Sequence, residues 1–275
     1  MATALVVLAR WGIATNFIGL ISNDSFGKAI QKSLEKEGVD SSGTIIRKGR
    51  RSQFAFICIE KNTGRRTIFW ARPECAPIQP EELPMASIAA AEVLHLDGLF
   101  VEASIRAAKY ANRRKIPVVL DAGSLRPGML EVVRHTDHLI AAEQFAKEYA
   151  EGEPYESALH RLRRLGPKVV VVTLGERGSI GLWNDRVLHV PALPVKALDT
   201  TGAGDVFHGA YVFGLLRKWD PAKRLALATT AAALSCRAIG GRSGIPALEE
   251  ALTKMKELPP CTSWVSSGAL GPPRG

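Results

Sequence analysis

The sequence predicts an α/β protein: a doubly wound, mostly parallel sheet with helices on both of its faces. The first observation is that β-rich runs alternate with stretches of helical period over residues 92–173, an order typical of parallel sheets. The second is that residues 117–120 and 169–172 are apolar without alternation, as in strands buried on both faces. Thirdly, chemistry-bearing residues stand where strands end, at the edge where such sheets bind ligands. They are Asp97, Asp121, Glu143 and Gly175.

The composition is that of an ordinary globular domain. The chain has 275 residues, 46% hydrophobic and 23% charged, which is enough to bury one sizeable core. No apolar run is long enough to span a bilayer, and the apolar start lacks a basic leader, so we expect neither a membrane segment nor a signal peptide. Four scattered cysteines without a C-x-x-C pair favour reduced thiols in a cytoplasmic protein over disulfides or a zinc site.

The net charge of +9 raises the question of an acidic partner. The basic residues form short clusters, such as residues 47–51 and 113–115, and no long basic tract is interleaved with aromatic residues. We therefore expect no nucleic-acid partner. A solvated surface with attraction for an anionic nucleotide accounts for the charge.

The first third of the chain predicts two helices, a strand and a hairpin. The helices are expected at residues 2–10 and 24–38, with a short strand at residues 15–21 between them. Two β-rich runs at residues 53–60 and 66–70 are joined by a turn-forming segment, which predicts a hairpin. The hairpin is either a lid over a site or an edge extension of the sheet.

A regular alternation follows. Strands are expected at residues 92–96, 117–121, 138–141 and 168–173, and helices at residues 103–114, 126–134, 145–150 and 155–165. Residues 229–239 predict a helix of small residues. Residues 263–275 are rich in small residues, Pro and Gly, which predicts a disordered tail.

The main candidate motif of the chain is Asp199-Thr200-Thr201-Gly202-Ala203-Gly204-Asp205. It stands where a loop enters a helix, so its two glycines can turn backbone N–H groups toward one point, where the helix dipole favours a phosphate or phosphoryl group. Asp205 would then accept a proton from a hydroxyl that attacks the phosphorus. The alternative is an ordinary glycine-containing loop with Asp as a helix cap.

A second candidate loop, residues 173–179, leaves the strongest predicted strand into a tight turn with Gly175 and Gly178. Glycines there allow close approach of a ligand, although a plain connection between strands has the same composition.

Three polar residues near these motifs are given ordinary roles. We expect His95, which alternates within a strand, to be a core histidine. Asp121 is expected to be a cap or loop residue. His208, three positions after Asp205 on the same helix, is expected to contribute packing.

Residues 199–209 resemble the C-terminal signature of the PfkB (ribokinase-like) carbohydrate kinases, and residues 2–40 and 173–178 resemble two further segments of that family. The resemblance implies a ribokinase-like kinase domain over residues 1–258, with a small β lid that includes a hairpin at about residues 50–72, and a disordered tail over residues 259–275. It also implies a cytoplasmic, ATP-dependent kinase that transfers the γ-phosphate to a sugar hydroxyl. Lid-mediated homodimers are one arrangement it allows.

Site roles are carried over from the family residue by residue. Asp205 would be the general base, and the anion hole would be formed by Gly202, Ala203 and Gly204. The nucleotide would be bound by Thr173, Gly175, Gly178, Thr200 and Thr201. The resemblance also implies a site for a monovalent cation such as K⁺ at the loop of residues 240–246.

Residues 141–146 depart from the family's magnesium motif, N-x-x-E, because Ala142 and Phe145 occupy its Asn and Glu positions. Glu143 could substitute by binding Mg²⁺ through water, or it could be a plain surface residue. This departure is similar to the ketohexokinase and sulfofructose-kinase side of the family.

The family pattern also has a strand, a sugar-binding Asp and a double glycine ahead of the segment that matches at Ala2. We therefore expect a truncated sugar site and an incomplete lid. Two alternatives remain open: a non-catalytic relative that binds a nucleotide or a partner, and a nucleoside or sugar-phosphate kinase of the same fold.

Overall fold

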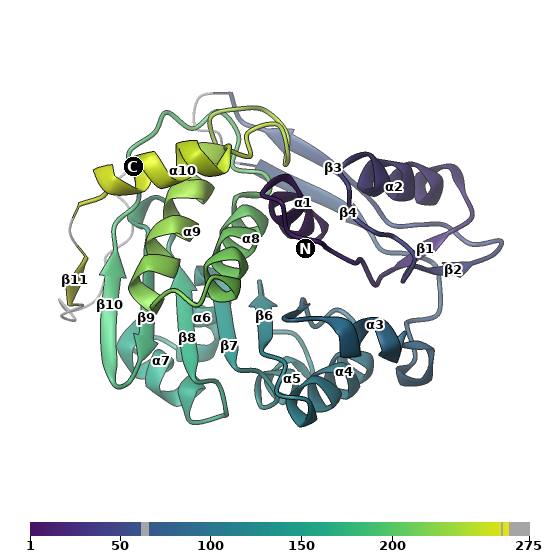
Figure 1. Cartoon of the computed structure of the whole chain (residues 1–275), viewed down its shortest axis with the longest axis horizontal. Coiled ribbons are helices and arrows are strands. Elements are labelled where there is room, and N and C mark those ends of the chain that lie inside the picture. Colours follow the sequence, from purple (N-terminus) through teal and green to yellow (C-terminus); the bar gives the residue numbers. More distant parts are fainter. Residues whose placement is uncertain (62–65, 260, 264–275) are drawn as a thin grey trace.

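The computed structural model describes residues 1–61, 66–259 and 261–263. Within these residues a seven-stranded sheet forms the centre of the molecule, in the order β11-β10-β9-β8-β7-β6-β5 (Figure 1). The strands are β5 (Leu94–Leu96), β6 (Val118–Ala122), β7 (His138–Ala142), β8 (Val169–Thr173), β9 (Ser179–Trp183), β10 (Arg186–Val190) and β11 (Thr262–Ser263). Strands β5 to β8 are parallel, and β9 to β11 continue the sheet antiparallel. The predicted mostly parallel sheet is confirmed.

Helices cover both faces of this sheet. Alternate strand residues such as Val119 and Val171 face a core formed with α1 (Ala2–Arg10), α8 (Ala203–Leu216), α9 (Pro221–Ser235) and α10 (Leu248–Lys254). Their neighbours Leu120 and Val170 face a second core. The helices on that side are α4 (Val101–Arg113), α5 (Met129–Val133), α6 (Glu143–Ala150) and α7 (Tyr155–Arg163). None of the helices in the described part of the chain is long and apolar enough to cross a membrane.

A small β layer stands apart from the main sheet. Strands β3 (Phe54–Ile59) and β4 (Arg66–Ala71) form the predicted hairpin, as an antiparallel two-stranded sheet of their own. Strands β1 (Leu20–Ser22) and β2 (Ile45–Arg47) form a parallel pair beside α2 (Ser25–Lys36). Figure 1 shows the hairpin running from this pair toward the ends of α1 and α10. It is therefore no edge extension of the main sheet.

Some predicted boundaries are wrong. Of the strand expected at residues 15–21, only its end is part of β1, and Asn16 makes an isolated bridge to Asp40. The helix expected at residues 229–239 begins at Pro221, because the side chain of Asp220 caps it, and it ends at Ser235. Strand β2 and helix α3 (Met85–Ala90) were not predicted. The disordered tail expected at residues 259–275 begins too early, because Thr262–Ser263 form β11; residues 264–275 lie outside the described residues.

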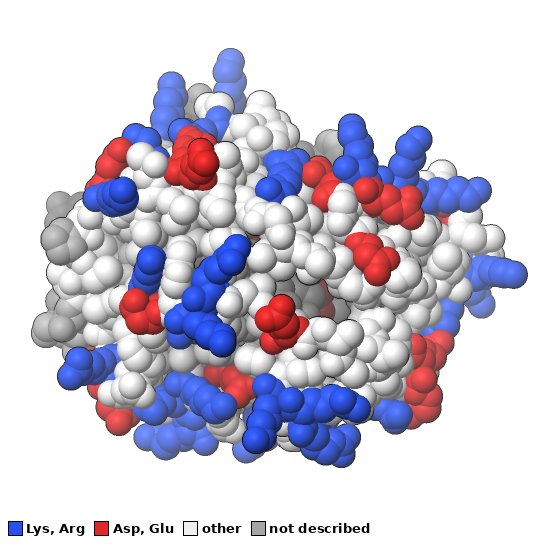
Figure 2. Space-filling model, in the orientation of Figure 1, with Lys and Arg blue, Asp and Glu red and all other residues white. Residues whose placement is uncertain are grey.

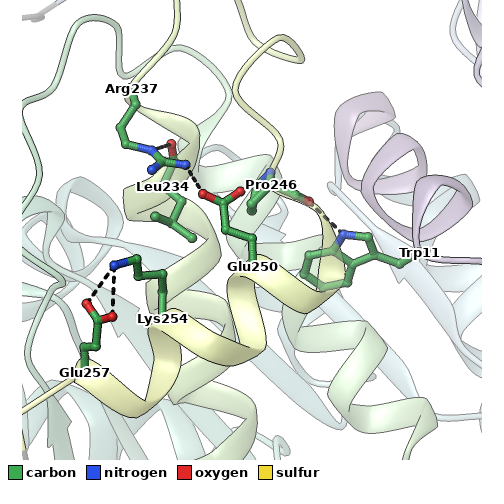
Figure 3. Close-up of polar contacts among 7 residues, drawn as sticks. All are labelled: Trp11, Leu234, Arg237, Pro246, Glu250, Lys254 and Glu257. Carbon is green, nitrogen blue, oxygen red and sulfur yellow. Dashed lines mark hydrogen bonds and ion pairs between the residues drawn. The ribbon is translucent and has the colours of Figure 1, made fainter.

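Helix α1 lies very close to α8. A Cβ added at Gly209 would stand 2.7 Å from the carbonyl oxygen of Ala4, so only glycine allows this approach. At the other end of α1, the indole Nε1–H of Trp11 donates to the carbonyl of Pro246 at 3.0 Å (Figure 3). These contacts fix the start of α1 beside the start of α8.

Candidate active site

The carboxyl ends of the parallel strands open into a recess. Figure 2 shows this face of the molecule hollowed near its centre, where in Figure 1 the end of β6 faces α1 and α8. Asp121 lies near the end of β6 and Asp97 follows β5. Asp205, on the first turn of α8, comes to the same edge because His208, one turn further on, contacts Asp121. Doubly wound sheets bind their ligands at this edge.

The motif at residues 199–205 forms the predicted loop-to-helix entry. Gly202 is the N-cap of α8, with φ +78° in the left-handed region. The N–H of Ala203 donates to the carbonyl of Thr200, and within the described residues the N–H groups of Gly204 and Asp205 have no acceptor. Two free N–H groups at a helix N-terminus are what an anion cradle requires.

The two glycines of this motif do different things. A Cβ at Gly202 would stand 2.7 Å from the carbonyl oxygen of Gly241, whereas a Cβ at Gly204 would meet nothing within 4 Å. Packing and backbone conformation therefore require Gly202. Gly204 is exposed and faces open space, so its lack of a side chain leaves room above the cradle.

Asp199 holds this loop in place through two hydrogen bonds to backbone N–H groups. It is buried, its Oδ1 accepts from the N–H of Thr201 at 2.8 Å, and its Oδ2 accepts from the N–H of Gly240 at 2.7 Å. Burial raises the pKa of Asp199, but these hydrogen bonds lower it overall. The ionised carboxylate therefore ties the motif to the loop that follows α9.

Asp205 has a cationic partner. The amino group of Met1 donates to its Oδ1 at 2.6 Å, and both side chains are about one quarter exposed, 21% and 24%. Burial lowers the pKa of this amine, but the carboxylates of Asp205, Asp121 and Asp97 raise it overall. The charges of these three carboxylates therefore all act on the amine, although only Asp205 contacts it.

The second candidate loop shows the same division of roles between its glycines. Gly178 has φ +88°, and a Cβ there would stand 2.0 Å from the carbonyl of Val190. Gly175 also has a positive φ, but it is exposed and has nothing within 4 Å of an added Cβ. Thr173 ends β8 half-buried, with its Oγ1 directed to the carbonyl of Ala141 at 3.5 Å.

Glu143 belongs to an ion-pair cluster. Its Oε1 accepts from Tyr155 at 2.7 Å and also contacts Arg177 and Lys147. Arg177 is part of the loop at residues 173–179, so Glu143 fixes that loop through the guanidinium. Its Oε2 has no hydrogen bond from the described residues. In that same part of the chain no group of three or more His, Cys, Asp or Glu residues is arranged to hold a metal ion.

The lid reaches the motif through a residue that the sequence analysis missed. Arg66, at the start of β4, donates from Nη1 to the hydroxyl of Thr200 at 2.7 Å. The two residues are 134 positions apart, and no local pattern marks Arg66 as special. Its guanidinium stands beside the candidate anion cradle.

Three residues given ordinary roles contact one another around the buried His208. His208 Nδ1 lies 3.2 Å from His95 Nε2, and His208 Nε2 lies 3.4 Å from Asp121 Oδ1. Asp121 lies within β6, so the expected cap or loop role is wrong. The expected core position of His95 stays a prediction, and its Nδ1 is buried without a partner among the described residues. The signal available was that both strands end at the ligand edge.

A groove begins beside the motif at Leu198. Its volume is about 440 Å³, and its lining includes Leu193, Val195 and Leu234. Figure 3 shows the ion pairs along its polar wall: Arg237 contacts Glu250, and Lys254 contacts Glu257. The groove is large enough for a flat heterocycle.

Comparison with known proteins agrees with this geometry. The chain matches the model of the pfkB family carbohydrate kinases over residues 2–248. It is 28% identical over 246 residues to a ribokinase of Lactococcus lactis, covering 88% of this chain and 80% of that protein. It is 29% identical over 269 residues to a fructokinase of Klebsiella pneumoniae, covering 89% and 87%.

Solved structures give the same result for the fold. A ribokinase from Thermotoga maritima superposes with a TM-score of 0.81 and 28% identity, covering 93% of this chain and 86% of that one. An E. coli protein in complex with ATP and Mg²⁺ superposes with a TM-score of 0.83 over 93% of this chain and 87% of that one; at 22% identity this likeness shows the fold alone. The architecture, the loop-to-helix motif and the family match lead to one conclusion: this chain belongs to the pfkB family of carbohydrate kinases.

Proposed function

We propose that this protein transfers the γ-phosphate of ATP to a hydroxyl of a sugar, with Asp205 as the general base. The observation that carries the proposal is the start of α8, where two unpaired backbone N–H groups adjoin a carboxylate. The acceptor oxygen attacks the γ-phosphorus, the bond from that phosphorus to the β–γ bridging oxygen breaks, and ADP leaves. The proton of the hydroxyl goes to Asp205.

The N–H groups of Gly204 and Asp205 then stabilise the charge on the transferring group, together with the partial positive charge of the helix terminus. Gly202 and Ala203 give the loop the shape that aims them. Thr200 and Thr201 bind the nucleotide from the same loop, and Thr173, Gly175 and Gly178 bind its phosphates from the loop after β8. The groove that begins at Leu198 is the proposed place for the adenine.

Mg²⁺ supplies charge neutralisation of the phosphates when it is bound with ATP. A nucleotide-borne Mg²⁺ keeps several waters, so a single nearby carboxylate is a sufficient protein partner. Glu143 fits this role through its Oε2, since its three cationic or hydroxyl partners all contact Oε1. A monovalent cation such as K⁺ at residues 240–246 stays a prediction; the contact between Asp199 and Gly240 supports it by holding that loop against the motif.

The lid completes the proposed site in two ways. Arg66 places a guanidinium next to Thr200, where it would contact the phosphates of the nucleotide. The hairpin also exposes large apolar side chains, including Phe56 at 64% and Phe69 at 58%, which supports pairing of two lids in a homodimer. The four cysteines are free thiols, in agreement with a reducing, cytoplasmic location.

The test is Asp205→Asn. We expect turnover to fall by roughly 10²–10⁴-fold, the usual effect of losing a general base, while ATP affinity measured by calorimetry stays within about threefold. Asp185→Asn serves as the control, because it removes the same charge from an exposed turn. An Asp205→Asn enzyme that releases ADP at the wild-type rate in the presence of sugar would remove Asp205 from the mechanism.

A further inference from the structure

A chain of three polar side chains joins two strands of the sheet to the helix that carries Asp205, and its central member, His208, is buried. His208, on α8, is 4% exposed and its ring stacks on that of His95 with centroids 5.0 Å apart. Its two ring nitrogens contact His95 on one side and Asp121 on the other, at 3.2 and 3.4 Å. The mechanism proposed above uses none of these groups.

The hydrogen bonds of this chain have one consistent direction. The Asp121 carboxylate accepts, so His208 Nε2 must carry a hydrogen and donate it. In a neutral His208 the Nδ1 then accepts, and His95 Nε2–H is its donor. His95 Nδ1 is left as a bare acceptor, which fits its burial without a partner; a hydrogen there would be buried without an acceptor. Burial, together with His208 beside it, holds the pKa of His95 well below its usual range.

Asp121 therefore stays ionised in the recess. Burial raises the pKa of its carboxyl, but the neighbouring His208 and the amino group of Met1 lower it overall. The only contact the structure gives this carboxylate within the described residues is His208 at 3.4 Å. A carboxylate has about four acceptor positions, so Asp121 retains capacity to accept hydrogen bonds from a ligand.

Asp121, whose side chain is 25% exposed, lies close to the proposed site of phosphoryl transfer. His208 follows Asp205 by three residues, so the two side chains are neighbours on one face of α8. The amino group that donates to Asp205 also interacts with the charges of Asp121 and Asp97. Two arginines near these carboxylates are already engaged: Arg126 donates to the backbone carbonyl of Asp97, and Arg242 to the hydroxyl of Ser33.

We propose that Asp121 accepts a hydrogen bond from a second hydroxyl of the acceptor sugar, and that His208 and His95 are positioning residues that hold its carboxylate. This proposal rests on the proposed function and deepens it by naming the substrate class. Asp121 and Asp205, brought to the same edge of the sheet by α8, favour an uncharged, polyhydroxylated acceptor over a sugar phosphate, whose dianion they would repel.

The first experiment compares wild type with Asp121→Asn on ribose, fructose and their terminal phosphates, by ADP release and by calorimetry. We expect the wild type to use the unphosphorylated sugars. For Asp121→Asn, we expect kcat/KM for the sugar to fall roughly 10- to 100-fold, the discrimination a buried hydroxyl contact provides, with KM for ATP unchanged. Asp185→Asn is the matched control and should leave both constants unchanged.

The positioning role has its own readout. His208→Gln should raise KM for the sugar but not KM for ATP, and should add little to the defect of Asp121→Asn, because it acts through that carboxylate. If His208→Gln alone unfolds the protein, the double variant Asp121→Asn/His208→Gln removes the unpaired charge, and its KM for the sugar should then equal that of Asp121→Asn; a clearly higher KM would also overturn the positioning role. Full additivity of the two changes would overturn the positioning role.

The outcomes also separate this proposal from the proposed function. Phosphate transfer with an unchanged sugar KM in Asp121→Asn, or a preference for phosphorylated sugars, overturns the role of Asp121 and leaves the kinase assignment standing. Sugar binding that depends on Asp121, without any phosphate transfer, overturns the proposed kinase function and leaves the role of Asp121 standing. If no sugar of the panel binds or reacts, both are overturned.

Discussion

The difference between the two glycines of the motif yields a prediction that separates folding from function. Gly204→Val places a β-branched side chain on the first turn of α8, where an added Cβ meets nothing within 4 Å. Val and Gly differ in helix propensity by only about 0.5 kcal/mol. We therefore expect the melting temperature to change by no more than roughly 2 °C. The side chain nevertheless fills the space above the cradle, and losing an anion-hole contact costs roughly 10²–10³-fold in kcat.

Gly202→Ala should behave in the opposite way. Its left-handed conformation, φ +78°, costs a residue with a Cβ roughly 1–2 kcal/mol. The 2.7 Å approach to the carbonyl of Gly241 adds about 1–3 kcal/mol unless the backbone shifts. We expect a fall in melting temperature of roughly 5–15 °C. Both variants are tested by calorimetric melting and by ADP-release kinetics. A stable Gly204→Val protein with wild-type kcat would refute the proposed anion cradle. An unchanged melting temperature for Gly202→Ala would refute the packing argument for Gly202.

Two further predictions concern the lid and the core. Arg66→Ala should raise KM for ATP roughly 3- to 10-fold, the lower part of the range for a charged hydrogen bond, because the guanidinium is exposed. Arg72→Ala is the control: it removes a guanidinium that lies over Trp70 of β4 and should leave KM for ATP unchanged. Equal effects of the two variants would deny Arg66 a specific role. Burial, with Arg224 nearby, lowers the pKa of His138 to about 4. Because the unfolded chain takes up this proton near pH 6.5 and the folded protein only near pH 4, stability should fall by up to about 3 kcal/mol as the pH drops between these values. Urea unfolding at pH 7 and pH 4.5 tests this, with His138→Gln as the reference that should lose this part of the pH dependence.

The sequence predicted the parallel part of the central sheet, β5 to β8, because buried parallel strands leave a strong signal, and it did not predict the antiparallel strands β9 to β11. The runs at residues 117–120 and 169–172 became β6 and β8 almost without change of boundary, since a continuous β-branched run has few other structures open to it. The early strand at residues 15–21 was overpredicted because an apolar run alone does not specify a pairing partner. The start of α9 was missed because Asp220 and Pro221 were not read as a cap and first turn.

The candidate site likewise contains residues that the sequence could indicate and residues that it could not. Gly202, Gly204 and Asp205 could be proposed from the sequence because the motif is contiguous, and its chemistry follows from backbone geometry at a helix start. The roles proposed for Asp121 and Arg66 depend on tertiary contacts with α8 and with Thr200. No periodicity along one strand reveals such a contact, so these residues could be placed only once the elements were assembled.

The lid hairpin has a practical consequence for spectroscopy. Strand β4 carries Trp70, 42% exposed, four residues from the arginine that contacts Thr200. The fluorescence emission of a partly exposed indole changes when water is excluded from its surroundings or when a neighbouring cationic side chain moves. Intrinsic fluorescence of Trp70, recorded in rapid mixing, would thus report any movement of the hairpin without an added label. A Trp70→Phe protein supplies the background emission of the other indoles.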